Sequence, residues 1–344
     1  MKFDVFLPSL LVTPAWFIDA APPRLPAIET LLARGTSHVS GAWPNVLLTA
    51  FGALDAIAAC SAIGDGLEAD TRGWMFAEPV HLQADRDALK LFPASCLAIS
   101  AVEALQLTDA LNENFADRDL FFSRGASGCW YVSCSLDELP QTTPIRHAQR
   151  GALMEKLPRS RGKISWKAIQ NEAQMLLHSH AVNAAREASA TMTINGVWFW
   201  GEVVHPAQPI SLKPSIGAVF GDIPLAKGLA KWAGARYAPL AQLTLADTAS
   251  LTDHNVLLID SLDVLHARGD VDEWRETARR LDAEIFAPLL AILRSAAIDE
   301  VVLTLPRADD SLIVSIHAKS FRGSGGWWKA LTETPRSIVE FSLA

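Results

Sequence analysis

The residues best suited to chemistry lie in the segment 171–201, where polar side chains stand between two apolar elements. His180, Asn183 and Arg186 belong to the polar run, and Asn195 stands two residues before an apolar run. Because loops carry binding groups on a rigid scaffold, these side chains predict a shelf that holds a ligand. The alternative is that Asn183 and Arg186 satisfy backbone carbonyl groups around the loop, and spacing alone favours this alternative.

The elements that must position this shelf can be read from the hydrophobic pattern. Trp166, Ile169, Ala173 and Leu177 recur at helical spacing, which predicts a helix before the polar run. The apolar run 197–200 predicts a buried strand after it. The expected order is therefore helix, polar loop, strand.

The two ends of the chain show alternating strands and helices. Asp270 or Asp272 can cap a long helix whose apolar positions line one face. This alternation indicates a mixed α/β sheet that is covered on both faces by helices. The predicted elements are strands at 3–7, 256–259, 298–305 and 312–317, and helices at 26–35 and from 270 onward.

The middle of the chain has a different pattern. A helix is predicted at 101–115, short strands at 120–122 and 130–133, and then a loop rich in proline and arginine. This pattern indicates a smaller α+β domain inserted into the larger one. The expected boundaries are a core domain of residues 1–74 and 166–344, and an inserted domain of residues 75–165.

Composition indicates an ordinary globular protein. The chain has 344 residues, of which 50% are hydrophobic, and a formal net charge of −8. This charge disfavours nucleic acid as a partner, because phosphate binding needs clustered Lys and Arg. The one notable basic cluster, within 146–163, is either a docking patch for an anion or a partner, or a set of solvated loop charges. No signal peptide and no membrane-spanning segment are expected, so a cytoplasmic location is predicted.

The four cysteines, at 60, 96, 129 and 134, have neither metal-binding spacing nor the density of a disulfide-rich secreted domain. Cys129 and Cys134 are expected in or beside a strand, where they pack as small hydrophobic side chains. No metal site or disulfide is therefore predicted from them.

Several motifs resemble the archaeal-type cofactor-independent phosphoglycerate mutases. Their His-Pro-Val-Asn, Arg, Asn and Trp-Leu-Trp-Gly are matched by His180-Ala181-Val182-Asn183, Arg186, Asn195 and Trp198-Phe199-Trp200-Gly201. The block 217–234, which includes Lys227, is similar to the segment that follows in that family, and 99–115 and 125–132 are similar to its inserted domain. The segments 74–82 and 174–177 resemble the RpfE-type bacterial regulatory proteins, a branch of that lineage. The resemblance implies an alkaline-phosphatase-like mixed sheet sandwiched by helices, with a smaller inserted α+β domain.

The same resemblance implies that the family's chemistry is lost. Such enzymes use two divalent metals and a phosphorylated serine, because phosphoryl transfer needs cations to neutralise developing charge. Their first-strand Asp-Gly-Met-Gly-Asp motif corresponds to Leu7-Pro8-Ser9-Leu10, which has no carboxylate. Their Ser-Asp segment corresponds to residues 43–52, where Thr49 is a hydroxyl inside a helix. Arginines that would clamp phosphate are replaced by residues 90–95 and by Cys129.

Some side chains of the metal-ligand type remain near the family's third and fourth motifs. An Asp and a His three or four residues apart on a short loop can reach one ion, so a residual site for a single Mn or Zn ion is an alternative. Solvated polar loop groups are the other interpretation, under which no cofactor is expected. The weak metal candidates are Asp260, Asp263, His266, Asp309, Asp310 and His317.

These observations together predict a catalytically degenerate phosphoglycerate-mutase-like protein with a regulatory or ligand-binding role. Its ligand would be a small phosphorylated or anionic compound, held by His180, Asn183, Arg186, Asn195 and Lys227. Arg186 is the anion-recognising candidate, oriented by the two asparagines. One alternative is an active metal-dependent phosphomutase or phosphatase. Another is a module that binds a protein partner through Trp327, Trp328 and the basic loop 146–163.

Overall fold

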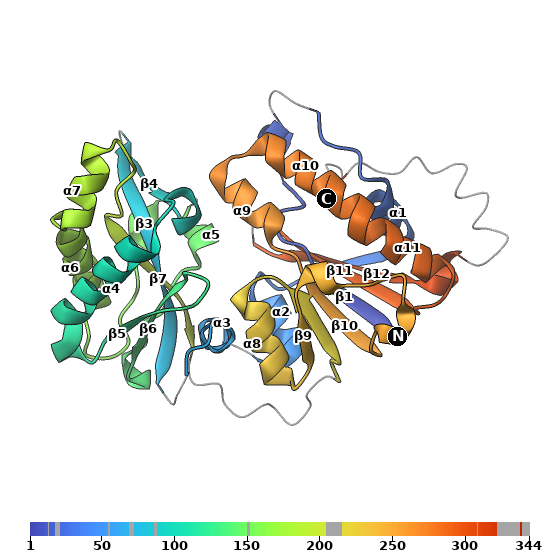
Figure 1. The fold of residues 1–344 in the computed structure, drawn as a ribbon, viewed down its shortest axis with the longest axis horizontal. Coiled ribbons are helices and arrows are strands. Elements are labelled where there is room, and N and C mark those ends of the chain that lie inside the picture. The colour runs from blue at the N-terminus through green and yellow to red at the C-terminus, as the bar shows by residue number, and fades with distance from the viewer. Residues whose placement is uncertain are drawn as a thin grey trace. The chain divides into compact units, whose positions relative to one another are not determined.

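The computed structural model forms two compact units, residues 1–51 with 213–344, and residues 52–212. Each unit contains its own sheet and helices, and each is described by itself (Figure 1). The structure describes residues 1–12, 14–17, 21–53, 56–68, 72–85, 88–149, 152–203, 215–307, 309–321 and 338.

The first unit is built on a seven-stranded sheet with the order β2-β12-β11-β1-β10-β8-β9. The strands β11, β1, β10, β8 and β9 are parallel, whereas β12 and β2 continue the sheet as antiparallel pairs. The strands are β1 (Lys2–Phe6), β2 (Thr36–Ser40), β8 (Ala218–Gly221), β9 (Arg236–Ala238), β10 (His254–Leu258), β11 (Glu300–Pro306) and β12 (Ser311–His317).

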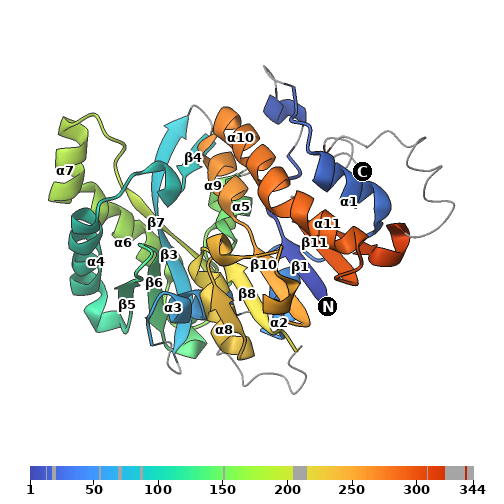
Figure 2. The same ribbon diagram turned by 45° about the vertical axis from the view of Figure 1, so that its right-hand side comes forward.

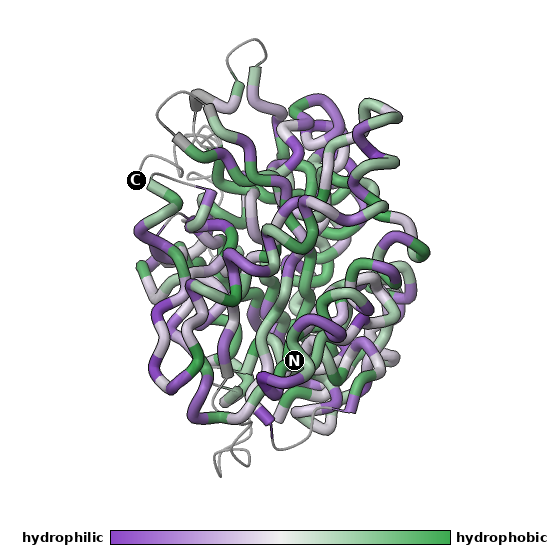
Figure 3. The backbone as a smooth tube through the Cα atoms, turned by 90° about the vertical axis from the view of Figure 1, so that its left-hand side faces the viewer, coloured by the Kyte–Doolittle hydropathy of each residue, from purple (hydrophilic) through white to green (hydrophobic). Residues whose placement is uncertain are grey.

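Helices cover this sheet on both faces (Figure 2). The strands β8 and β10 are buried at every residue, as expected of parallel strands that are covered on both faces. Hydrophilic and hydrophobic stretches alternate along the backbone (Figure 3). One face carries α1 (Pro26–Arg34), α9 (Ser261–Arg268), α10 (Val271–Leu281), a π-helical turn (Asp282–Phe286) and α11 (Ala287–Arg294), and the other carries α2 (Asn45–Phe51) and α8 (Pro224–Ala233).

The predicted long helix begins where its cap was expected. The side chain of Asp270 accepts a hydrogen bond from the backbone N–H of Glu273, which satisfies one free donor of the first turn of α10. Farther along, the buried Asp282 accepts hydrogen bonds from the backbone N–H groups of Ala27 and Ile28. Asp282 therefore caps the start of α1, although Leu25, the residue before this helix, provides no side-chain cap.

The second unit has a smaller sheet with the order β4-β3-β6-β5, in which β7 also pairs with β3. The strands are β3 (Gly73–Asp85), β4 (Ala88–Phe92), β5 (Phe121–Arg124), β6 (Trp130–Cys134) and β7 (Gly196–Val203). Hydrophobic side chains of α4 (Ala101–Phe115), α6 (Trp166–His178) and α7 (Ala181–Ala188) pack on one face. The helices α3 (Ile57–Gly64) and α5 (Ile145–Ala148) pack on the other face of the sheet. They contact the strand side chains that alternate in sequence with those of the first face.

The fold class is confirmed, since the chain is a mixed α/β protein with a central sheet flanked by helices and a second, smaller sheet. The observed units differ from the expected boundaries, because the second unit spans 52–212 instead of 75–165. The reason is that β7 pairs with β3 from Trp74 to Val80 and carries α6 and α7 with it.

The polar run before β7 is also different from the expectation. It is not a loop but the helix α7, whose first turn is capped by the ring of His180, which accepts a hydrogen bond from the N–H of Val182. Val182, Asn183 and Arg186 are buried on one side of this helix. Their spacing of one, three and four residues is typical of a helix face, so the run is amphipathic although it contains few large apolar residues.

Candidate functional site

The topology of the large sheet marks one place where ligands bind in open α/β proteins. From β8 the chain goes outward to β9, whereas from β10 it crosses to β11 on the far side of β1. In such sheets, ligands bind beyond the carboxyl ends of the strands where the connections diverge. The carboxyl ends of β8 and β10 are therefore the candidate functional site of the first unit.

Three carboxylates lie at this edge. Asp222 directly follows β8. Asp260 is the second residue after β10 and stands at the start of α9, with Asp263 in the first turn of that helix. Burial, the largest effect, together with the charges of Asp263 and Asp222, raises the pKa of Asp260 to about 6. Asp222 is exposed, and its carboxylate accepts a hydrogen bond of 3.1 Å from the N–H of Leu240.

Ser9 completes the edge from the neighbouring strand β1. It has a φ of 57°, a left-handed conformation that is uncommon for a residue with a side chain, and it is 7% exposed. Its hydroxyl donates to Asp263 at 2.7 Å, and its carbonyl accepts from the indole N–H of Trp274 at 3.0 Å. These two bonds hold the turn after β1, so the hydroxyl is fixed beside the carboxylates.

The close approach of α8 to this edge depends on Gly221. A Cβ atom there would lie 2.8 Å from the Cβ of Ala226 and 2.9 Å from the carbonyl oxygen of Leu258. Only glycine leaves room for the first turn of α8 to pack against the ends of β8 and β10. Asp222 is held next to Asp260 as a consequence.

Replacing Asp260 by asparagine is expected to raise the free energy of unfolding at pH 7 by about 1–3 kcal/mol. The pKa of Asp260 in the folded protein lies near 6, above the usual value of 3.8, so the folded state binds this proton more tightly than the unfolded state. Wild-type stability should therefore fall as the pH rises from about 4 to 6. Urea unfolding across this pH range measures the effect.

The exposed Asp253, replaced by asparagine, is the matched control for this experiment. It lies just before β10, at the other end of that strand, and should leave the pH dependence unchanged. Wild-type and Asp260→Asn curves that run parallel from pH 4 to 7 would contradict the account given for Asp260.

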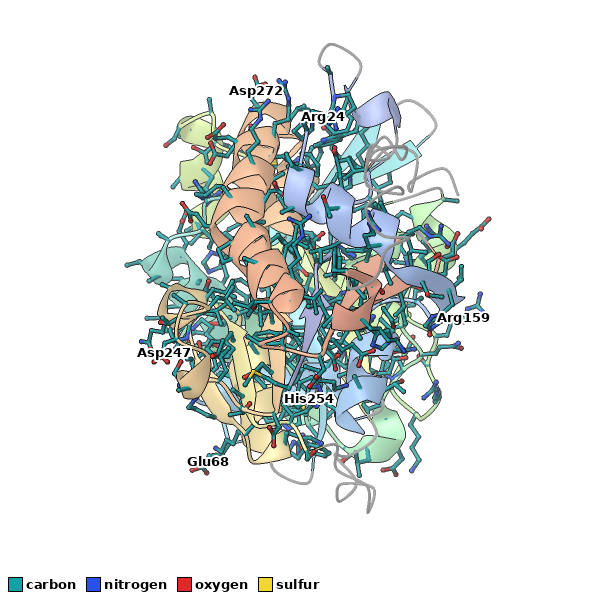
Figure 4. All side chains as sticks on the ribbon, turned by 90° about the vertical axis from the view of Figure 1, so that its right-hand side faces the viewer. Arg24, Glu68, Arg159, Asp247, His254 and Asp272 are labelled. Carbon is teal, nitrogen blue, oxygen red and sulfur yellow. The ribbon has the colours of Figure 1, made fainter. Side chains whose placement is uncertain are left out.

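The predicted metal candidates do not come together. His317 lies opposite Glu300, at the start of β11, whereas Asp260 and Asp263 lie beyond the other end of the sheet. Six residues of extended strand separate the two ends, which is about 20 Å. His317 instead lies 3.6 Å from the carboxylate of Glu300. At the same end of the sheet, His254, which is labelled in Figure 4, contacts Asp4 at 2.7 Å.

The remaining candidates have other contacts. Asp310 accepts two hydrogen bonds from the guanidinium of Arg307, at 2.6 and 3.0 Å, and Asp309 is exposed. The ring of His266 packs against Trp16 with centroids 4.6 Å apart. Within the described ranges, no three His, Cys, Asp or Glu side chains are grouped to hold a metal ion. These residues therefore do not fit the two-metal site of the family that the sequence resembles.

The predicted ligand shelf belongs to the second unit, and its two central residues are engaged in internal hydrogen bonds. Asn183 donates to the carbonyls of Leu177 and Ile194 at 2.7 and 2.8 Å, and accepts from the N–H of Ile194 at 2.7 Å. Arg186, only 4% exposed, donates to the carbonyls of Met192 and Leu97 and to the carboxylate of Glu103. This geometry favours the backbone-satisfying interpretation over an anion site.

The other shelf residues follow the same pattern or lie elsewhere. Asn195 accepts from the N–H of Leu82 at 2.7 Å and donates to its carbonyl at 2.9 Å, which extends the pairing of β3 with β7. His180 caps α7. Lys227 is exposed on α8 in the first unit, so the first unit holds one member of the set and the second unit holds four.

The described cysteines are free thiols. Burial raises the pKa of Cys129 to about 11 and that of Cys134 to about 12, so both thiols are protonated at neutral pH. Cys134 is buried in β6 and Cys129 precedes that strand. Trp327 and Trp328 lie outside the described residues. Among the described residues, no helix has the length and apolar character to cross a membrane.

Comparisons with known proteins show the fold and nothing finer. No protein-family profile and no curated protein sequence matches the chain. A solved structure of the PH0037 protein from Pyrococcus horikoshii is similar, with a TM-score of 0.52 and 16% identity, and the match covers 92% of this chain and 87% of that one. A cofactor-independent phosphoglycerate mutase from Thermoplasma acidophilum matches with a TM-score of 0.45 and 16% identity, over 94% and 95% of the two chains. The chain and PH0037 therefore share a mixed α/β fold.

The sequence did not point to Ser9 and Asp222 as site residues. The sequence did contain a signal for them. Ser9 follows a predicted strand and Asp222 follows an apolar run, and the carboxyl ends of parallel strands meet at one edge of a sheet. What the sequence lacked was the strand order, which alone shows that β1, β8 and β10 are neighbours.

Proposed function

We propose that this chain is a phosphoglycerate-mutase-like protein that has lost two-metal phosphoryl transfer and has a regulatory or ligand-binding role. The observation that carries the proposal is that His317 lies at the opposite end of the large sheet from Asp260 and Asp263, while Asp310 is paired with Arg307. Ser9 stands at the end of β1, where the resembled family has its first metal-binding carboxylate. A donor set without His317, and with Asp310 bound to an arginine, is poorly suited to hold two ions.

The ligand site that we propose is the edge formed by Ser9, Asp222, Asp260 and Asp263. Its charge is negative, so it disfavours phosphate and favours ligands that donate hydrogen bonds. The contacts of Arg186 argue against an anion site there, because its guanidinium N–H groups donate to Glu103 and to two backbone carbonyls. An assignment to the RpfE-type regulatory proteins is part of this proposal and rests on the sequence resemblance. A cytoplasmic location is proposed as well.

Metal content and phosphatase activity of one purified sample test the proposal. After chelation and dialysis, mass spectrometry of the metal content and turnover of p-nitrophenyl phosphate in added Mn²⁺ or Zn²⁺ are measured. We expect no stoichiometric metal and no turnover above the protein-free control. Two ions per chain together with turnover would return the protein to the active phosphomutase class.

A variant sharpens the test. If the edge holds a catalytic metal, Asp263→Asn should abolish turnover, because it removes the carboxylate nearest Ser9. His317→Asn is the matched control, since His317 lies at the other end of the sheet. Under the proposal, wild type and both variants all show the same p-nitrophenyl phosphate turnover as the protein-free control.

A further inference from the structure

The strand β2 forms one edge of the seven-stranded sheet. Among the described residues it pairs with β12 on one side, from Thr36 to Ser40, and with no strand on the other. Four of its five residues are exposed, and Val39 is 57% exposed. A strand in this position presents a row of backbone N–H and C=O groups that can pair with another strand.

The other strands at the ends of the two sheets carry a charge that discourages such pairing. Arg236 lies on β9, which has only three residues, Lys90 lies on β4, and Arg124 lies on β5. Short strands and inserted cations are the usual devices that block edge-to-edge association. The sequence of β2, TSHVS, contains neither a charge that is fixed at neutral pH nor a proline.

We propose that β2 is an interface with a second copy of this chain, in which the two β2 strands pair antiparallel across a two-fold axis. If the two-fold axis is perpendicular to the sheet, the same face of both copies points to the same side. Residues that pair across the axis must then belong to the same face. Centring the axis on His38 overlaps all five residues. It places Thr36 opposite Ser40 and Ser37 opposite Val39, and forms roughly four to six backbone hydrogen bonds.

A second copy suits this edge better than an unrelated charged partner. Across the two-fold axis no fixed like charges face each other, because β2 carries none, and the side chains that meet are small or β-branched. A five-residue strand buries less surface than a standard interface, so the dimer should be weak and depend on concentration. This inference does not depend on the proposed function.

The first experiment measures mass against concentration by sedimentation equilibrium. Wild type should approach a dimer as its concentration is raised toward about 1 mM. Val39→Lys should increase the dissociation constant by about tenfold or more, because a lysine on an edge strand blocks pairing. Val102→Lys, at a 65% exposed valine of α4 in the other unit, is the matched control and should leave the constant unchanged.

The second experiment tests the register by disulfide formation. His38→Cys should give a covalent dimer in mild oxidant, because the two His38 Cα atoms would lie within disulfide reach. Thr36→Cys alone should not, whereas Thr36→Cys mixed with Ser40→Cys should. Wild type under the same oxidant controls for its own free cysteines.

Two results would overturn the proposal. One is a wild-type protein that remains monomeric at the highest concentration, whether or not it binds extended peptides of other proteins. The other is a dimer that Val39→Lys does not weaken. Circular dichroism of each variant confirms that the comparison is made between folded proteins.

Discussion

Replacing Arg186 by alanine is expected to lower the free energy of unfolding by about 3–5 kcal/mol. Its guanidinium, 4% exposed, joins three parts of the second unit through the carbonyls of Leu97 and Met192 and the carboxylate of Glu103. Burial opposes ionisation of Glu103, but hydrogen bonds from Ser100 and Arg186 bring its pKa below the usual value. The variant would remove the guanidinium from both carbonyls and from this carboxylate, which would keep only its bond from the N–H of Ser100.

Denaturant unfolding of the purified variant measures this loss, and Arg118→Ala is the matched control. Arg118 also pairs with a glutamate, Glu172, but both side chains are more than a third exposed. Its removal should cost less than about 1 kcal/mol. Arg186→Lys should recover only part of the lost stability, since a lysine ammonium cannot reproduce the planar arrangement of guanidinium donors that reaches all three acceptors.

The same variants separate a structural role of Arg186 from an anion-binding role. If Arg186 bound an anion, wild type would be stabilised by inorganic phosphate, and Arg186→Ala would lose that stabilisation with little change in phosphate-free buffer. Unchanged stability in phosphate-free buffer would therefore contradict the structural account.

Replacing Asp65 by alanine is the second large expected effect, a loss of about 3 kcal/mol in the free energy of unfolding. Its carboxylate, on a residue 6% exposed at the end of α3, accepts from the hydroxyls of Ser127 and Tyr131 and from the N–H of Ser127. Burial, as the largest effect, raises the pKa of the Tyr131 phenol, so the phenol stays protonated and remains a donor. The carboxylate thus ties α3 to the turn between β5 and β6.

A paired variant makes this prediction specific. A Cβ atom at Gly125 would lie 2.0 Å from Asp65 Oδ2, so Gly125→Ala alone should also destabilise the protein. In the double variant the loss should be smaller than the sum of the two single losses, because Asp65→Ala removes the carboxylate atoms that the new methyl group meets and leaves only the Cβ of residue 65, at 2.6 Å. Strict additivity in urea unfolding would contradict the proposed contact. Asp109→Ala, at an exposed carboxylate of α4, controls for charge and should change stability by less than about 0.5 kcal/mol.

Local patterns in the sequence predicted many elements correctly. The helix at 101–115 was predicted at its observed bounds, and its capping box between Ser100 and Glu103 is a local device of neighbouring residues. The helix at 26–35 ends at Arg34 with Gly35 as its cap, and the strand at 312–317 matches β12 to within a residue. Hydrophobic periodicity and caps act over a few residues, so a single sequence contains them.

The candidate sites could not be placed from the sequence, because they depend on contacts between distant residues. The sequence showed His317 and Asp260 as members of one possible metal set, and it could not show that strand pairing places them at opposite ends of one sheet. It left Arg186 either as an anion-binding group or as a donor to backbone carbonyls, and it could not identify the partners at residues 97 and 103.

The sequence by itself determined the fold class, the main elements and a strong family resemblance, because these follow from composition, short-range periodicity and local motifs. Only the tertiary structure decided what the polar residues do. Ser9 meets Asp263 across 254 positions of the chain, and β7 joins β3 and so moves α6 and α7 out of the expected core domain. Strand order and register determine these contacts, and both are settled by which apolar faces pack together over the whole chain.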